Sequence, residues 1–252
     1  TKQGVLLHEI ENPDKNRSVC MAITTSLDSD SFGVPTSWSA AIDEFLADSK
    51  DNANRLMYVS AGNVCPFELR DVSYPDVNIN SAIENPGQSW NAITVGAYNS
   101  KIQIDDLGLA DYQPIAEIDA LSPYSKTSNL WEHKWPIKPE VLMDGGNIAG
   151  KDNFYTECDD LSLLTTNHKI VDNLFSTIWA TSSATAQASK LSAEIYCQYP
   201  TAWPETIRAL MVHSARWTDK MKEQFLPNPN PNKSEIRYLL RTCGYGIPNF
   251  ER

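Results

Sequence analysis

The sequence predicts an α/β fold built on a mostly parallel sheet, and three observations carry that prediction. Residues 18–24 and 56–59 are short, nearly continuous apolar runs of the kind that form strands buried on both faces. Between them lies one apolar stripe at helical spacing: Trp38, Ala41, Ile42, Phe45 and Leu46. A strand, a helix and a second strand in this order require a right-handed crossover, which makes the two strands parallel.

Length and composition limit the classes of protein that fit. The chain has 252 residues, enough for one full-sized α/β domain. A hydrophobic fraction of 41% with 21% charged residues is typical of globular proteins. The formal net charge of -11 argues against a nucleic-acid partner, which would need a basic face. No apolar window of about 18 residues occurs, so we expect no membrane span and no membrane partner.

The five cysteines are scattered along the chain and form no Cys-x-x-Cys pair, so we expect no metal site and no cofactor. The acidic pairs at 105–106 and 159–160 lack the spacing of a calcium loop and read as solvated surface charge. Cys20 and Cys197 lie in apolar runs and are predicted to be small buried side chains. This use of cysteine favours a reducing, cytoplasmic location.

The first half of the chain places polar residues where predicted strands end. The chain begins with a helical pattern that has no start signal, and the strand at 18–24 then runs out at Thr24-Thr25-Ser26. Thr36 is a candidate cap for the helix that follows. The strand at 56–59 ends in Ser60-Ala61-Gly62-Asn63. Active residues of parallel sheets lie at such carboxyl ends, although an asparagine after glycine also fits a simple turn.

The second half contains the longest uninterrupted helical pattern. Residues 68–88 are rich in Asp, Asn and Pro and are predicted to form a surface loop. No Gly or Pro interrupts residues 182–199, in which Ala184, Ala188, Leu191 and Ile195 recur at helical spacing. Residues 226–232, Leu-Pro-Asn-Pro-Asn-Pro-Asn, are predicted to be an extended connector before a last helix.

Ser182 stands in the first turn of that helix, where backbone N–H groups lack intrahelical partners and the helix dipole favours negative charge. Such a position suits a nucleophile whose reaction creates an oxyanion. It equally suits an ordinary helix cap, and an isolated Thr-Ser pair favours the cap.

Several motifs in one order distinguish these alternatives. Ala180-Thr181-Ser182 resembles the Gly-Thr-Ser motif of the subtilases, the subtilisin-like serine proteases, with Ala180 in place of the usual glycine. Residues 59–63 resemble the family's Ala-Ala-Gly-Asn strand end, and residues 204–210 resemble its next helix. Further stretches are similar to family strands, turns and the closing Gly-Tyr-Gly: residues 90–97, 121–125, 135–141 and 243–249.

The resemblance implies a subtilisin-like fold, a doubly wound, mostly parallel sheet with helices on both faces. It implies a bacterial, cytoplasmic type of serine endopeptidase that needs no cofactor and acts on a peptide or protein substrate. Ser182 would be the nucleophile and the Asn63 side chain would donate to the oxyanion. Substrate would bind along Thr24, Thr25, Ser26, Ser60, Ala61 and Gly62.

The acid and base of a subtilase triad have no counterpart. The family supplies the acid in Asp-Ser/Thr-Gly and the base in His-Gly-Thr, and neither motif occurs in this sequence. The sequence has four histidines: His8, His133, His168 and His213. The resemblance begins after the family's catalytic histidine. Residues 1–252 are therefore predicted to be the C-terminal two-thirds of a peptidase domain, truncated at the N-terminus. The missing N-terminal part would be its partner, and the chain alone would be inactive.

Two other interpretations stay open. A pseudoprotease or peptide-binding interaction module would keep the fold without the chemistry. An unrelated doubly wound ligand-binding domain would share only the alternation of strands and helices.

Overall fold

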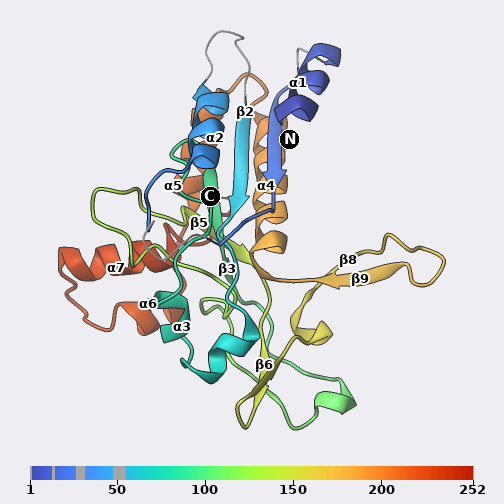
Figure 1. Cartoon of the computed structure of the whole chain (residues 1–252), viewed down its shortest axis with the longest axis vertical. Helices are drawn as coiled ribbons and strands as arrows, with labels where there is room; N and C mark the ends of the chain where they lie inside the picture. Colours follow the sequence, from blue (N-terminus) through green and yellow to red (C-terminus); the bar gives the residue numbers. More distant parts are fainter. Residues whose placement is uncertain (1, 13–14, 27–31, 48–54, 252) are drawn as a thin grey trace.

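The computed structural model describes residues 2–12, 15–26, 32–47 and 55–251 (Figure 1). Its centre is a four-stranded sheet in the order β1-β2-β3-β5, and every neighbouring pair is parallel. The strands are β1 (Arg17–Met21), β2 (Arg55–Ser60), β3 (Ile93–Tyr98) and β5 (Val141–Asp144). The predicted α/β class with a mostly parallel sheet is confirmed.

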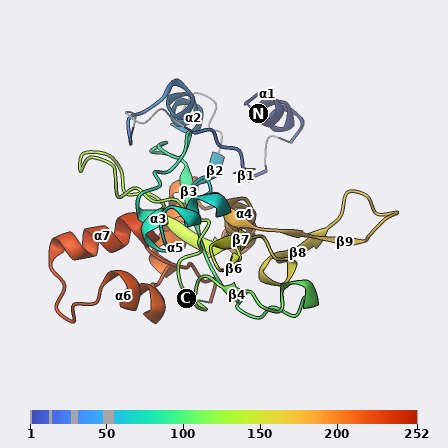
Figure 2. The same ribbon diagram turned by 60° about the horizontal axis from the view of Figure 1, so that its bottom comes forward.

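Helices cover both faces of this sheet, as Figure 2 shows. On one face lie α4 (Ala180–Gln198) and α5 (Pro204–Ser214), which pack on Tyr58, Val95 and Val141. On the other lie α1 (Lys2–Glu11) and α2 (Ser37–Ala47), which pack on Met57 and Val59. Successive residues of β2 thus face opposite layers, and both layers exclude water. This is why residues 56–59 of the strand are all apolar instead of alternating with polar residues.

β1 differs from the prediction because it is an edge strand. Among the described residues it pairs with β2 alone. Cys20 is exposed and Met21 is the buried residue of the strand, so the predicted burial of β1 and of Cys20 is wrong. Cys197 is also exposed, near the end of α4, where the neighbouring Ile195 and Tyr196 take the core positions. An apolar run in the sequence does not reveal whether both sides of a strand are occupied.

The predicted surface loop at residues 68–88 is also wrong. The segment carries part of a short 3-10 helix, η2 (Pro66–Arg70), and a turn of helix, α3 (Asp76–Ile79), and much of it is buried. The two N–H groups of the buried Asn78 amide are shared among three carbonyl oxygens 2.7–3.1 Å away in another segment, those of Ser122, Pro123 and Ser125. The polar composition therefore serves internal hydrogen bonds to irregular backbone rather than contact with water.

Smaller elements surround the carboxyl end of the sheet. Three short strands form one antiparallel sheet: β4 (Gln113–Pro114), β6 (Ala149–Lys151) and β7 (Phe154–Thr156). The hairpin of β8 (Leu163–Thr166) and β9 (Phe175–Ile178) projects from the body of the protein and leads into α4 (Figure 1). The described residues also include two further 3-10 turns, η3 (Leu107–Leu109) and η4 (Asp159–Leu161).

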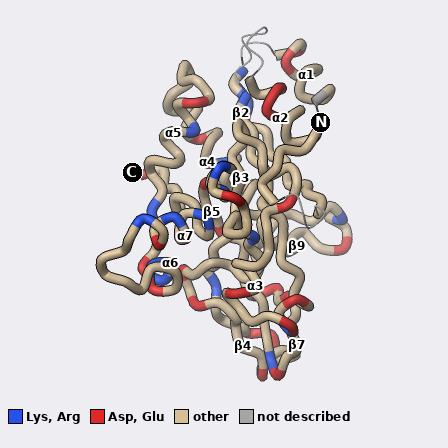
Figure 3. The backbone as a smooth tube through the Cα atoms, turned by 60° about the vertical axis from the view of Figure 1, so that its left-hand side comes forward, with Lys and Arg blue, Asp and Glu red and all other residues tan. Residues whose placement is uncertain are grey.

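The C-terminal part packs beside β5. It consists of α6 (Asp219–Phe225), the connector at 226–232, and α7 (Lys233–Cys243), whose apolar residues surround Leu121 and Leu142. Basic and acidic residues are interspersed along the chain (Figure 3). The charges are therefore best considered as individual ion pairs, since the chain shows no large region of one sign in this view.

An ion pair joins α1 to the start of β2 and predicts a pH dependence of stability. Both Glu9 carboxylate oxygens accept hydrogen bonds from the buried Arg55 side chain at 2.7 Å. These bonds hold the pKa of the Glu9 carboxyl below its usual value of 4.5. A carboxyl whose pKa is lower in the folded state stabilises the fold above its unfolded pKa, and that contribution disappears as the pH falls through the folded pKa.

Glu9→Gln is therefore expected to lower the free energy of unfolding by about 1–2 kcal/mol near pH 7, and by much less near pH 3. Urea unfolding of both proteins across this range measures the difference. Glu11→Gln removes an exposed carboxyl from the same helix and serves as the control. An equal loss at both pH values would contradict a role for the charged form of Glu9.

Candidate functional site

Ser182 lies half-buried in the first turn of α4. The hydroxyl groups on either side of it have structural partners: Thr181 Oγ1 donates to Asn63 Oδ1 at 2.6 Å, and Ser183 Oγ donates to Ala180 O at 2.8 Å. Within the described part of the chain, the Ser182 hydroxyl has no hydrogen-bond partner. The helix is preceded by Trp179, which makes no side-chain cap. The alternative that Ser182 caps the helix is therefore not supported by its contacts.

Ala180, which stands where the subtilase motif has glycine, adopts the backbone conformation of a glycine. Its φ is 64°, in the left-handed region, and its N–H donates to Gly145 O at 2.7 Å. The methyl group is buried in a cluster with Val64, Tyr124 and Ile148. The left-handed backbone costs a residue with a Cβ about 1–2 kcal/mol. Burial of the methyl group offsets part of that cost, by about 0.8 kcal/mol.

Ala180→Gly is therefore expected to change the free energy of unfolding by less than about 1 kcal/mol, because relief of strain opposes the lost methyl contact and the added freedom of the unfolded chain. Ala188→Gly is the matched control, a buried alanine inside the same helix. It should cost roughly 2 kcal/mol, from helix propensity and the lost methyl. Denaturant unfolding compares the two variants. Equal losses at both positions would contradict the left-handed conformation.

Asn63 reaches the start of α4 from the end of β2. Its Oδ1 accepts hydrogen bonds from Thr181 N–H at 3.0 Å and from Thr181 Oγ1 at 2.6 Å. A backbone N–H can only donate, so the accepting atom must be the amide oxygen and not the nitrogen. The amide N–H₂ group of this exposed side chain is thus left as a donor, and it has no partner among the residues that the structure describes.

The structure therefore brings Asn63 beside the residue that precedes Ser182. Thr181 joins them, and sequence reasoning assigned it no role. The sequence feature that could have pointed to Thr181 is its position in the motif, between Ala180 and the predicted nucleophile Ser182. An oriented amide donor beside a serine with an unused hydroxyl, at a helix N-terminus, can stabilise negative charge that develops on a substrate oxygen.

The predicted substrate-binding residues fall on two segments at the same end of the sheet. Thr24 is half-buried, while Thr25 and Ser26 are exposed; residues 60–62 are buried. Thr25 exchanges backbone hydrogen bonds with Asn85, at 2.9 and 3.1 Å. The buried position of residues 60–62 leaves mainly their backbone available to a ligand.

The histidines are not placed to activate Ser182. His8 Nδ1 accepts from Arg17 at the start of β1, and His133 contacts Arg237 on α7. His168 lies in the turn between β8 and β9, and His213 lies on α5. In the described part of the chain none of the four is hydrogen-bonded to Ser182. In the described residues the predicted nucleophile, Ser182, and the predicted oxyanion donor, Asn63, thus come together without a histidine.

A metal centre would need several ligating side chains close together. The described residues contain no cluster of three or more His, Cys, Asp or Glu side chains that could hold a metal ion. Of the helices in the described ranges, none is both long and apolar enough to cross a bilayer.

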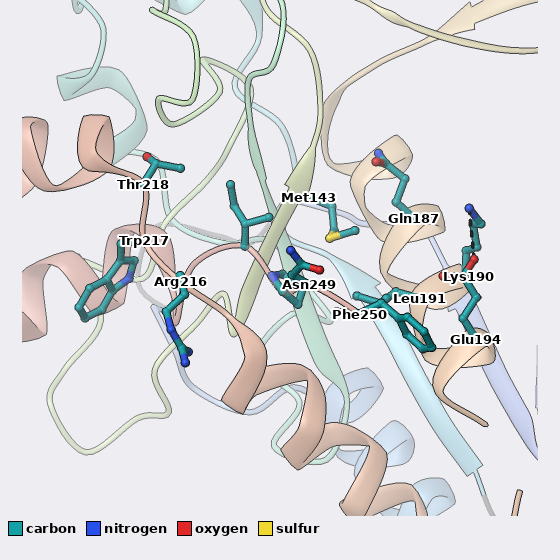
Figure 4. Close-up of a pocket in the computed structure, with 12 residues that line it drawn as sticks. Met143, Gln187, Lys190, Leu191, Glu194, Arg216, Trp217, Thr218, Asn249 and Phe250 are labelled. Carbon is teal, nitrogen blue, oxygen red and sulfur yellow. Dashed lines mark ion pairs between the residues drawn. The ribbon is translucent and has the colours of Figure 1, made fainter. Parts of the chain in front are cut away.

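A hollow of about 410 Å³ lies against the middle of α4, beside the C-terminal segment (Figure 4). Its lining includes Lys190 and Glu194, an ion pair at 3.4 Å, together with Arg216 and Phe250. None of the predicted site residues lines it. The candidate site is therefore at the first turn of α4 and not in this hollow.

Comparisons with known proteins identify the family of the chain. The subtilase family model matches residues 3–246. The uncharacterized protein y4bN of Sinorhizobium fredii (strain NBRC 101917 / NGR234) is 26% identical over 236 residues, which are 85% of this chain and 50% of the relative. The chain thus spans about half the length of this curated relative.

Two solved protease structures also match the chain. The prenylagaramide maturation protease PagA has a TM-score of 0.53 and 14% identity, covering 100% of this chain and 66% of that one. The S41 psychrophilic protease has a TM-score of 0.46 and 18% identity, covering 84% and 53%. With the family model matching almost from end to end and the sheet, helices and motif order in agreement, the chain belongs to the subtilase family.

Proposed function

We propose that this chain is the part of a serine endopeptidase domain that supplies the nucleophile and the oxyanion donors. Ser182 Oγ forms a bond to the carbonyl carbon of a peptide while its proton passes to a base. The Asn63 amide N–H and the Ser182 backbone N–H donate to the oxyanion. The amine then leaves with a proton from that base, and water hydrolyses the acyl-enzyme.

The observation that carries this proposal is the pair of hydrogen bonds from Thr181 to Asn63 Oδ1. They fix which end of the amide is available as a donor. A donor held in place before reaction needs little reorganisation when charge develops, which is the source of its catalytic effect. An asparagine in a plain turn after glycine would not need this orientation.

We further propose that a segment of the same protein, outside residues 1–252, supplies the histidine and the aspartate. β1 offers an unpaired edge among the described residues. Exposed apolar side chains occur on α1, namely Leu7 and Ile10, and just after β1, namely Ile23. An added parallel strand would pair with β1 and cover apolar surface of this kind. The family relative, which is about twice as long as the matched region, has room for such a segment.

A reducing, cytoplasmic location belongs to the same proposal. Cys20, Cys65 and Cys197 are free and exposed. Exposed thiols of this kind persist where disulfides are kept reduced.

The alternative is a pseudoprotease that binds peptides. It is favoured by one observation, that the Ser182 hydroxyl has no histidine partner in the described residues. A fluorophosphonate probe separates the two. We expect the longer natural protein to be labelled at Ser182 and to hydrolyse peptides, and the isolated chain of 252 residues to do neither at a useful rate. Failure of the folded longer protein to label would favour the pseudoprotease.

A further inference from the structure

A partly buried ion pair lies beside the two predicted substrate-binding segments. Glu84 Oε1 and Lys126 Nζ are 2.9 Å apart, and their side chains are 16% and 15% exposed. The second Glu84 oxygen accepts a hydrogen bond from the Thr24 hydroxyl. Neither charged residue was predicted to belong to the site. Glu84 falls in residues 68–88, which were predicted to form a surface loop, and Lys126 was assigned no role.

Glu84 is held against both segments by its backbone as well as its side chain. Its N–H donates to Ala61 O at 2.9 Å, and the next residue, Asn85, pairs with Thr25. A Cβ on Gly62 would come within 2.6 Å of the Glu84 carboxyl carbon, and Gly62 also has a φ of 89°. The side chain of Glu84 therefore lies directly against the backbone that leads to Asn63.

Lys126 approaches from a third segment. The residue before it, Ser125, forms an isolated β-bridge with Asn63. The ion pair thus links Thr24, on one predicted substrate segment, to the surroundings of the oxyanion donor on the other. On the proposed function, substrate lies along these two segments, which brings the side chain beside the cleaved bond next to this pair.

The two charges cancel each other. A cationic substrate side chain would be attracted by Glu84 and repelled by Lys126, and an anionic one would meet the opposite combination. To gain a full ion pair, either would have to break the existing one and leave a partly buried charge without its partner, which is costly. A neutral side chain meets no such cost.

We propose that the Glu84–Lys126 pair determines the charge specificity of the substrate site, admitting a neutral side chain next to the cleaved bond and disfavouring either charge. This rests on the proposed peptidase function. Specificity is a difference between affinities, and here it arises from the cost imposed on the wrong ligands. Removal of one charge leaves the other without its partner. Each single variant should therefore prefer a substrate side chain of charge opposite to the residue that remains.

Lys126→Met leaves Glu84 unpaired and is expected to raise the ratio of kcat/KM for a basic over a neutral substrate roughly 10- to 100-fold. Glu84→Gln leaves Lys126 unpaired and is expected to raise the acidic-over-neutral ratio by a similar factor. The double variant should return to the neutral preference. Lys126→Arg keeps the charge and should behave like the natural protein.

The experiment uses the longer protein of the proposed function and three fluorogenic peptides that differ only in the residue on the acyl side of the cleaved bond, Met, Lys or Glu. Lys151→Met and Asp111→Asn are the matched controls. They disrupt a more exposed pair on another part of the surface, at 2.8 Å, with the same changes in net charge. The controls should leave the preference unchanged. Thermal unfolding and fluorophosphonate labelling show that each variant is folded and has a reactive Ser182.

Binding of the same peptides to each variant in a Ser182→Ala background, followed by fluorescence anisotropy, gives a second readout that needs no hydrolysis. A charge switch in binding without labelling of any variant would support the specificity role and reject the peptidase function. Labelled, folded variants with unchanged charge ratios would overturn the specificity role and leave the peptidase function intact. Absence of peptide binding together with absence of turnover would overturn both.

Discussion

In the longer protein that we propose, replacing Ser182 by alanine is expected to lower kcat for peptide hydrolysis by about 10⁶-fold, the magnitude measured for subtilisin, another member of the family. The physical reason is that the acyl-enzyme cannot form without the hydroxyl oxygen. Because that hydroxyl has no hydrogen-bond partner within the described residues, the substitution should leave the free energy of unfolding nearly unchanged. Steady-state turnover and denaturant unfolding measure the two effects.

The adjacent serine provides a sharp control. Ser183 is buried; its hydroxyl donates to Ala180 O at 2.8 Å and has Asp144 O as an alternative acceptor at 3.2 Å. Ser183→Ala should therefore lower stability by about 1 kcal/mol while the enzyme keeps most of its turnover and its fluorophosphonate labelling. The opposite pattern, with turnover lost in Ser183→Ala and kept in Ser182→Ala, would show that the nucleophile had been assigned to the wrong serine.

The second large effect is expected at Asn63. Asn63→Ala should lower kcat by about 10²–10³-fold with a much smaller change in KM, because the amide donates most strongly once the oxyanion has formed. Part of this loss would come from Thr181, whose N–H and hydroxyl would lose their acceptor. Alanine alone does not separate the donor from the loss of this contact.

Asn63→Asp makes that separation. A carboxylate can still accept both hydrogen bonds from Thr181, yet it has no N–H to donate and its charge opposes an oxyanion. We expect Asn63→Asp to lose at least as much kcat as Asn63→Ala while it keeps more of the stability. Single-turnover kinetics with each variant measure the loss in the chemical step. Natural turnover in Asn63→Asp would mean that another group holds the oxyanion.

The helices and central strands were predictable because their signals are local. The pattern at residues 182–199 corresponds to α4, and the apolar run at 56–59 lies within β2, since burial against a neighbouring layer imposes a period that survives in the sequence. The cap at Thr36 is local in the same sense, for its hydroxyl accepts from the Ser39 N–H at 3.1 Å. Motif order was sufficient to identify the family.

The wrong predictions concern the neighbours of a segment in the folded protein, which the segment's own sequence does not specify. The exposure of Cys20 depends on whether a strand adjoins the free edge of β1, and nothing in residues 17–21 encodes that neighbour. The segment at 68–88 is polar because its amides bond to distant backbone, such as Asn78 to Ser122, which composition alone cannot distinguish from contact with water.

For the candidate site, the sequence was enough to propose Ser182 and Asn63, because a nucleophile and an oxyanion donor require particular residue types in a particular motif. Their relation depends on contacts across 118 positions of sequence, from Asn63 to Thr181. The left-handed φ of Ala180 and the meeting of Glu84 with Lys126 likewise follow only when the chain is folded. Hydrogen bonds and ion pairs act over a few ångströms, and it is the tertiary packing that brings residues from separate segments within that range.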